Sequence, residues 1–169
     1  LLFGISMLYG ATGSTILPQI IDIVQKNGAD TPLMIVGMAL VVIAMSFKIA
    51  IVPFHMWTPD VYTGAPTPVT GFLSSAAKAV GFAVFVRVIL TGIPLENANW
   101  ENVFWILAVL SMTVGNLMAL RQSEIKRMLA FSSIAHAGYV MVALVVGSDS
   151  AISGVIFYSL AYAVMGTGA

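Results

Sequence analysis

Long apolar runs separated by short polar connections dominate the chain. A hydrocarbon core about 30 Å thick is crossed by roughly 20 helical residues, and six runs reach or approach that length. Unpaired backbone N–H and C=O groups are costly in lipid, so these runs should be helical. The pattern predicts an all-α fold, a polytopic transmembrane helix bundle in which short connections make successive helices antiparallel neighbours. The predicted spans are 1–24, 33–63, 66–91, 102–120, 127–147 and 150–169.

The second of these runs is too long for one straight span, and it contains Pro53 and Pro59. Proline removes a backbone N–H and clashes with the preceding turn, and it disfavours helical geometry in the residue before it. We expect a helix to about Ile51, a break over Val52–His55 and a half-helix to about Tyr62. Discontinuous helices mark ion sites in transporters. A proline kink without a transport role is the alternative, and the prolines alone do not decide between the two.

Composition agrees with a membrane protein. Of the 169 residues, 59% are hydrophobic and 8% are charged, whereas soluble domains carry about 25% charged residues. Seven basic and seven acidic side chains give zero net charge, so nothing favours nucleic acid as a partner. Cysteine is absent, which excludes disulfides and cysteine-ligated metals. The first run lacks the basic start of a signal peptide. We expect one transmembrane domain over 1–169, an internal fragment of a longer multi-pass subunit.

The basic residues predict the orientation of the bundle. The connection 121–127 holds three of the seven Lys and Arg residues, so it is expected on the cytoplasmic side. Alternation then places the connections near 92–101 and 147–150 on the outer side. Both of these contain acidic residues and no Lys or Arg, which agrees with that orientation.

Two lysines interrupt runs that otherwise carry no charge. Lys48 lies about 22 Å along its helix, just before the predicted break, and Lys78 lies about 18 Å into the next run, at 1.5 Å per residue. A lysine at the centre of a span costs roughly 2.5–3.5 kcal/mol on insertion scales. Desolvation favours the neutral amine, so a lysine held there can take up and release a proton. Snorkelling to the interface is the alternative, and it suits Arg87, near the outer end of the helix, better than Lys78.

A histidine supplies a third titratable group at membrane depth. His136 lies roughly midway along the fifth run, with Ser132, Ser133 and Tyr139 close to it in sequence. Histidine titrates near neutral pH and can relay protons with hydroxyls, phenols and water. A packing histidine bonded to a neighbouring helix is the alternative, and the two lysines favour the relay. His55 lies at the break, and we expect it to order that loop rather than to carry protons.

Two stretches of the chain resemble one known family. The stretch 47–69 contains Phe-Lys, Val-Pro-Phe-His-Met-Trp-Thr-Pro-Asp-Val-Tyr and Gly-Ala-Pro-Thr-Pro, and Ser-Ala-Ala-Lys follows at 75–78. The stretch 126–139 reads Lys-Arg-Met-Leu-Ala-Phe-Ser-Ser-Ile-Ala-His-Ala-Gly-Tyr. Together they are similar to the antiporter-like membrane subunits of bacterial respiratory complex I, NADH:quinone oxidoreductase, and most of all to the subunit N type.

The resemblance implies a fold of fourteen transmembrane helices with two inverted five-helix repeats, of which this chain supplies helices six to eleven. It implies that Lys48 is the lysine of the first broken helix and Lys78 the central lysine of the next. His136 then lies on the polar axis that joins two half-channels. These three residues are the expected proton-transfer groups. The expected supporting residues are Pro53 and Pro59 at the break, and the polar His55, Ser132, Ser133 and Tyr139.

The resemblance also implies an activity, partners and a location. The chain would belong to a proton translocase in the bacterial inner (plasma) membrane, in contact with lipid and with the other membrane subunits of complex I. No cofactor is expected in this chain, because NADH, flavin, iron–sulfur clusters and quinone belong to partner subunits. A multisubunit cation/proton antiporter, a membrane-bound hydrogenase and the ferredoxin-driven chloroplast and cyanobacterial counterpart share the pattern. A structural membrane module without conduction is the alternative of a different class.

Overall fold

The computed structural model describes residues 1–28, 31–92 and 100–168. These residues form α-helices and one π-helical turn, and no strand occurs among them, which confirms the all-α prediction. The helices are α1 (Leu2–Thr12), α2 (Leu17–Asn27), α3 (Pro32–Ile49), α4 (Trp57–Gly64), α5 (Thr67–Phe72), the π-helical turn η1 (Leu73–Ala77), α6 (Lys78–Gly92), α7 (Trp100–Ala119), α8 (Ile125–Val146) and α9 (Asp149–Gly168).

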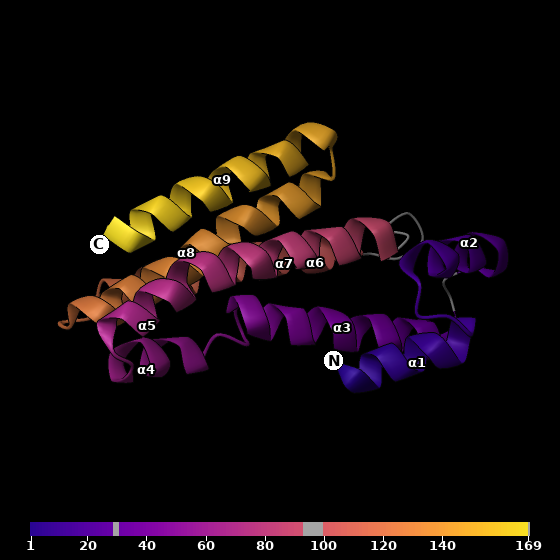
Figure 1. Cartoon of the computed structure of the whole chain (residues 1–169), viewed down its shortest axis with the longest axis horizontal. Coiled ribbons are helices and arrows are strands. Elements are labelled where there is room, and N and C mark those ends of the chain that lie inside the picture. Colours follow the sequence, from indigo (N-terminus) through magenta and orange to yellow (C-terminus); the bar gives the residue numbers. More distant parts are fainter. Residues whose placement is uncertain (29–30, 93–99, 169) are drawn as a thin grey trace.

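The long helices run roughly parallel or antiparallel to one another in a flattened bundle (Figure 1). At one edge, α1 packs against α3, and α6 lies next to α3. The pair α7 and α8 forms the most extensive helix contact in the described chain, and α9 packs on α8, α6 and η1 at the opposite edge. The short helix α4 lies against α8. Elements from distant parts of the sequence therefore meet at mid-bundle.

Five helices in the described part of the chain are long and apolar enough to cross a membrane. They are Pro32–Ile49, Thr67–Ile89, Trp100–Ala119, Ile125–Val146 and Ser150–Gly168. The predicted runs 33–63, 66–91, 102–120, 127–147 and 150–169 each begin and end within two residues of the corresponding helix or group of helices.

The first predicted run, 1–24, differs, because it contains the two short helices α1 and α2 in place of one continuous helix. Gly13 ends α1 in the left-handed conformation, at φ 72°, where its N–H donates to the carbonyl of Tyr9. A proline, Pro18, then lies in the first turn of α2.

The connections group at the two ends of the bundle as alternation requires. The turn at 65–66 and the connection 120–124 lie at the same end as the C-terminus, and the turn at 147–148 lies at the other (Figure 1). The predicted outer connection near 92–101 falls mostly outside the described residues. The assignment of one end to the cytoplasm stays a prediction.

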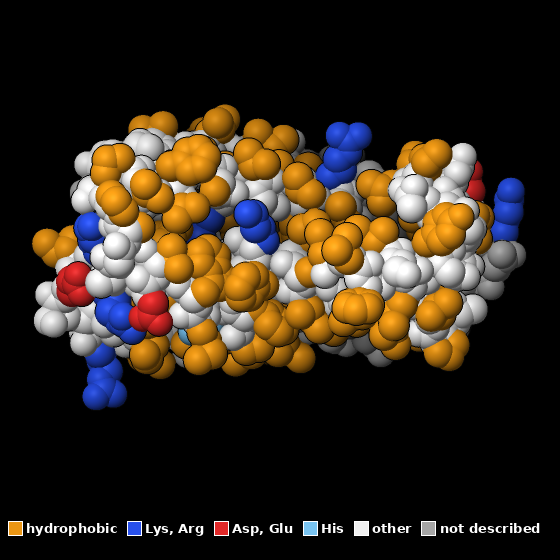
Figure 2. Space-filling model, turned by 60° about the horizontal axis from the view of Figure 1, so that its bottom comes forward, with side chains coloured by type: hydrophobic (Ala, Val, Ile, Leu, Met, Phe, Trp, Pro, Cys, Tyr) orange, Lys and Arg blue, Asp and Glu red, His pale blue; other side chains and the backbone are white. Residues whose placement is uncertain are grey.

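The surface is that of a chain surrounded by apolar neighbours. In the view of Figure 2, hydrophobic side chains cover most of the face, and most charged side chains gather toward its ends. Large apolar side chains such as Leu2, Phe3 and Phe157 are largely exposed. Exposed apolar surface on this scale is typical of segments that meet lipid or further helices rather than water.

Two glycines let α7 and α8 approach closely. A Cβ atom at Gly115 would lie 2.7 Å from the backbone nitrogen of Ala135, and one at Gly138 would lie 2.9 Å from that of Met112. Small residues allow this kind of backbone contact between membrane helices. The contact fixes the position of α8, which carries four of the predicted site residues: Ser132, Ser133, His136 and Tyr139.

Candidate functional site

The predicted break is present and begins earlier than expected. Helix α3 ends at Ile49, two residues before the predicted end, and α4 begins at Trp57. Ala50 adopts the left-handed conformation at φ 63° and donates its N–H to the carbonyl of Phe47, while the N–H of Ile51 donates to Ser46 O at 2.9 Å. This pair of hydrogen bonds is a Schellman motif. The break therefore starts at Ala50, ahead of the first proline, and the Val52–Pro53 peptide bond inside it is cis.

Backbone groups freed by the break find partners on other elements. The N–H of Val52 donates to Ser111 Oγ of α7 at 3.0 Å, and Ser111 Oγ donates to Leu107 O at 2.7 Å. The indole Nε1 of Trp57 donates to Phe47 O at 2.8 Å. Irregular backbone at membrane depth is stable only when protein or water satisfies it. Here α7 and α4 supply those partners.

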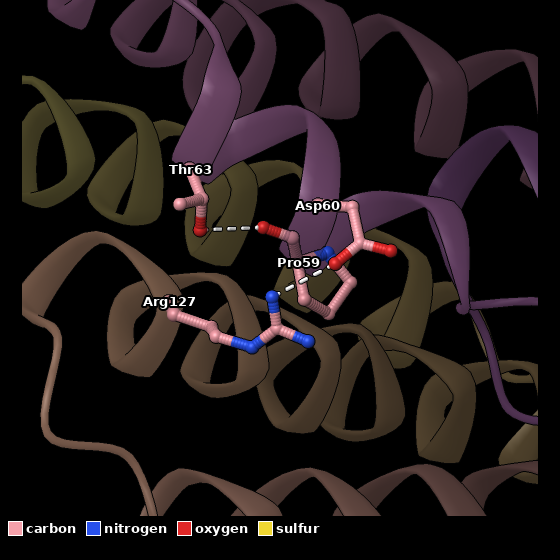
Figure 3. Close-up of polar contacts among 4 residues, drawn as sticks. All are labelled: Pro59, Asp60, Thr63 and Arg127. Carbon is pink, nitrogen blue, oxygen red and sulfur yellow. Dashed lines mark hydrogen bonds and ion pairs between the residues drawn. The ribbon is translucent and has the colours of Figure 1, made fainter.

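The second proline of the break is accommodated inside the half-helix. Pro59 lies in the first turn of α4, where a backbone N–H has no helical partner to lose. Its carbonyl accepts a hydrogen bond from Thr63 Oγ1 at 2.8 Å (Figure 3). Of the two prolines predicted to shape the break, Pro53 lies within it and Pro59 lies in the first turn of the half-helix that follows.

Helix α4 is tied to α8 at both of its ends. Arg127 forms an ion pair with Asp60 at 2.8 Å (Figure 3), and Lys126 Nζ donates to the carbonyl of Ala65 at 3.2 Å. The ion-paired side chains are 38% and 72% exposed, and such pairs contribute only about 0–1 kcal/mol. Their role is to position α4 against α8 rather than to supply much stability.

Lys78 is enclosed at the centre of its span. It directly follows the π-helical turn Leu73–Ala77, a feature that occurs frequently at functional sites. Its side chain is 3% exposed, and Nζ donates to Ser133 Oγ at 2.7 Å and to Ser133 O at 2.9 Å. Ser133 Oγ in turn donates to Ala130 O at 2.7 Å. No carboxylate of the described residues pairs with Lys78.

This geometry accommodates both protonation states of Lys78. An ammonium carries three N–H donors, and a neutral amine carries two donors and one lone pair. Ser133 accepts two donors in either state. The third position of Nζ, a proton in one state and a lone pair in the other, is the one that can exchange a proton.

His136 lies in a cluster of aromatic hydroxyls next to Lys78. Its Nδ1 is hydrogen-bonded to the hydroxyl of Tyr158 on α9. Its ring centroid is 4.8 Å from that of Tyr162 and 5.5 Å from that of Tyr139. A cavity of about 10 Å³ lies between α6, α8 and α9, close to the minimum that holds one water molecule. Its polar lining residues are Lys78, Ser133, His136, Tyr158, Ser159 and Tyr162.

The structure joins some predicted site residues and separates others. Lys78, Ser133 and His136 line one cavity, and Ser132 lines an adjacent groove. Tyr139 contacts the ring of His136 edge-on, and His55 is half-buried in the break between α3 and α4.

Lys48 lies apart from this cavity, and its side chain is exposed in the described part of the chain. Helix α3 buries the face that carries Val42, Ser46 and Ile49, and Lys48 lies off that face. Only its stem approaches α6, where Lys48 Cγ would lie 3.9 Å from a Cβ atom at Gly81. Lys48 does not line the cavity beside Lys78.

Three cavity-lining residues of α9 were not predicted from the sequence: Tyr158, Ser159 and Tyr162. The two tyrosines lie one helical turn apart on one face of an apolar helix, and this spacing is the sequence signal that could have identified them. No group of three or more His, Asp or Glu side chains that could hold a metal ion occurs in the described ranges.

Comparisons with known proteins agree with the resemblance in sequence. The family described as NADH:quinone oxidoreductase/Mrp antiporter, TM, matches residues 1–169. NADH-quinone oxidoreductase subunit N of Trichlorobacter lovleyi is 52% identical over 170 residues, which cover 100% of this chain and 35% of that protein. The chain thus spans about a third of the length of the curated relatives it matches.

Two solved structures share the fold. A chain of respiratory complex I from Thermus thermophilus matches with 40% identity and a TM-score of 0.71, over 98% of this chain and 36% of that one. A chain of the membrane-bound sulfane sulfur reductase, an archaeal respiratory membrane complex, matches with 28% identity and a TM-score of 0.86. That match covers 98% of this chain and 34% of the reductase chain. With a family match along its whole length, the chain belongs to the NADH:quinone oxidoreductase/Mrp antiporter transmembrane family.

Proposed function

We propose that this chain is part of a proton-translocating subunit of NADH:quinone oxidoreductase in the bacterial inner (plasma) membrane. Similarity to relatives named NADH-quinone oxidoreductase subunit N supports this assignment. The redox chemistry of NADH, flavin, iron–sulfur clusters and quinone then belongs to partner subunits, and the other membrane subunits of the complex are its direct partners. This chain contributes the translocase part of the enzyme, which moves protons without redox chemistry of its own.

The observation that carries the proposal is the environment of Lys78. An amine that is 3% exposed, at mid-span, with two neutral acceptors from Ser133 and no described carboxylate, is costly to keep charged. A merely structural lysine would be paired with an acid or would reach the interface. An amine that can lose its proton without losing its hydrogen bonds suits reversible proton transfer.

The proposed transfer uses Lys78 and His136 in sequence. The lone pair of neutral Nζ accepts a proton, and the resulting ammonium keeps its two contacts with Ser133. The proton then leaves through the shared cavity to the imidazole of His136, directly or by way of water, and Nζ recovers its lone pair. The hydrogen bond between His136 and Tyr158 fixes the ring in place for this exchange.

Lys48 is proposed as a second proton-transfer group, at the break. Its position in the last turn of α3 puts it beside the freed backbone of the broken helix. Its exposure leaves Nζ accessible to a group outside the described chain. Pro53 and Pro59 create the irregular segment, and His55, within that segment, is proposed to order it.

A second candidate function is a subunit of a multisubunit cation/proton antiporter or a membrane-bound hydrogenase. The favouring observation is that the matching family includes Mrp antiporters beside NADH:quinone oxidoreductase. A chain of the sulfane sulfur reductase, a different respiratory membrane complex, also superposes with a higher TM-score than the complex I chain, although its identity is lower. In that case the same lysines would move protons, and the coupled reaction would differ.

The test is proton pumping by the full-length subunit in the assembled enzyme, with Lys78→Ala and Lys48→Ala. NADH oxidation and proton uptake into vesicles are measured together, and Lys26→Ala, an exposed lysine of α2, is the control. Lost or lowered pumping per NADH in the two variants, with normal pumping in the control, supports the proposal. Full pumping stoichiometry in both variants shows that the lysines do not conduct.

A further inference from the structure

Two spaces in the structure meet at one pair of side chains. The cavity of about 10 Å³ beside Lys78 and a groove of about 680 Å³ share two lining residues, His136 and Tyr162. Lys78 and Ser133 line only the cavity, whereas Tyr62 and Lys126 line only the groove. We propose that the ring of Tyr162 is a barrier that controls access from the groove to Lys78.

The groove extends from one end of the bundle to mid-depth. On α8 its lining residues run from Ile125, in the first turn, through Leu129 and Ser132 to His136. These positions lie on one face of the helix, and eleven residues span roughly 16 Å at 1.5 Å per residue. The opposite walls come from α5, η1 and the last turns of α9. A path of this length joins the end that carries Lys126 to the level of His136.

The groove is lined mainly by apolar surface, but polar residues interrupt that surface along its length. Thr70, Ser75, Ser132 and Thr167 are among its lining residues. Tyr62 also lines it; this side chain is 2% exposed, and its hydroxyl has no hydrogen-bond partner among the described residues. A buried phenol of this kind is normally satisfied by a small polar partner such as water.

The barrier requires Tyr162 to move while His136 stays in place. His136 is held by its bond to Tyr158 and by its place on α8, whose backbone is fixed against α7 at Gly138. Tyr162 projects from α9 onto the His136 ring, at a centroid distance of 4.8 Å. A rotation of this side chain joins the two spaces, and its return closes the cavity.

This barrier deepens the proposed function and rests on it, because access matters only if Lys78 exchanges protons. With the Tyr162 ring in place, Lys78 exchanges protons only with His136, through the cavity. With the Tyr162 ring displaced, protons reach or leave Lys78 through the groove. A side chain that blocks one route while the other is used prevents protons from running freely through the subunit.

The test is passive proton leak through the assembled complex in proteoliposomes, without NADH and under an imposed potassium diffusion potential. Tyr162→Ala should raise the leak several-fold above wild type, and Lys78→Leu in the same protein should suppress the increase. Tyr162→Phe keeps the ring and should leak like wild type. The matched control is Phe157→Ala, which removes an aromatic ring from the exposed face of α9. Assembly is verified by NADH oxidation, and Tyr162→Leu replaces Tyr162→Ala if that variant does not assemble.

Two results would overturn the barrier: a leak in Tyr162→Ala no greater than in Phe157→Ala, or an equal leak in Tyr162→Phe and Tyr162→Ala. An increased leak that Lys78→Leu does not suppress would also overturn it. Failure of the proposed function looks different, because Lys78→Ala would then pump normally. Loss of pumping in Lys78→Ala with an unchanged leak in Tyr162→Ala rejects the barrier alone.

Discussion

Ser111→Ala should loosen the break in the broken helix without touching a titratable residue. Ser111 and Val52 are buried, and the Val52 N–H donates to Ser111 Oγ at 3.0 Å. The alanine side chain fits the same space but leaves this buried N–H without a partner. An unsatisfied buried donor costs about 1–3 kcal/mol. The second bond of Ser111, to Leu107 O at 2.7 Å, is lost at lower cost, because that helical carbonyl keeps the backbone N–H of Ser111 as a donor.

Hydrogen exchange of the assembled complex measures this loss where it occurs. Each 1.4 kcal/mol is a factor of ten in an equilibrium, so the amides of the segment 50–56 should exchange roughly 5- to 150-fold faster. Peptides from α9 should be unchanged. Ser123→Ala, at an exposed position of the connection between α7 and α8, is the control. Unchanged exchange over 50–56 in Ser111→Ala would refute the claim that α7 holds the break in place.

Three further substitutions test the packing around the site. Gly138→Ala places a Cβ atom 2.7 Å from Met112 Cγ, and this overpacking should destabilise the protein by about 1–3 kcal/mol. The loss is measured as a lower inactivation temperature. An unchanged temperature would contradict the close contact of α7 and α8. Asp60→Asn removes an exposed ion pair and should lower stability by less than about 1 kcal/mol. A large drop in the inactivation temperature would show that the pair does more than position α4. Trp57→Phe removes the indole donor to Phe47 O and leaves the Ala50 N–H as its remaining donor. The loss should cost about 0.5–1.5 kcal/mol, visible as faster exchange at the start of α4. Equal exchange would show that the indole hydrogen bond does not hold α4 in place.

The broken helix was predictable because its cause is local. Proline acts on its own backbone and on the residue before it, so a break near Pro53 could be predicted from sequence, whereas Pro59 lies within α4. The exact end of α3 could not be predicted. A left-handed residue at a helix end is usually glycine, and here Ala50 takes that conformation, so no sequence signal marks it. In the first predicted run, 1–24, a glycine does mark a helix end, because Gly13 ends α1 in the left-handed conformation. The apolar residues on both sides of Gly13 nevertheless predicted one continuous helix.

The candidate site was predictable only in part. A charged or titratable residue in an apolar run can be recognised from the sequence, which is how Lys78 and His136 were found. Which side chains surround them depends on helix packing. Tyr158 and Tyr162 reach His136 only because α9 folds back onto α8. The exposure of Lys48 has the same origin, since the buried face of α3 is set by its neighbours.

The proposed function requires Lys78 to lose and regain a proton during turnover. Lys78→Arg isolates this step, because arginine keeps a positive charge and a long donor side chain but is not deprotonated in proteins. Protons pumped per NADH oxidised are measured in the assembled complex, with Arg87→Lys as a control for basic-residue exchange in the same helix. We expect Lys78→Arg to assemble but to pump fewer protons per NADH than wild type, as Lys78→Ala does. Wild-type stoichiometry in Lys78→Arg would show that Lys78 need not release its proton.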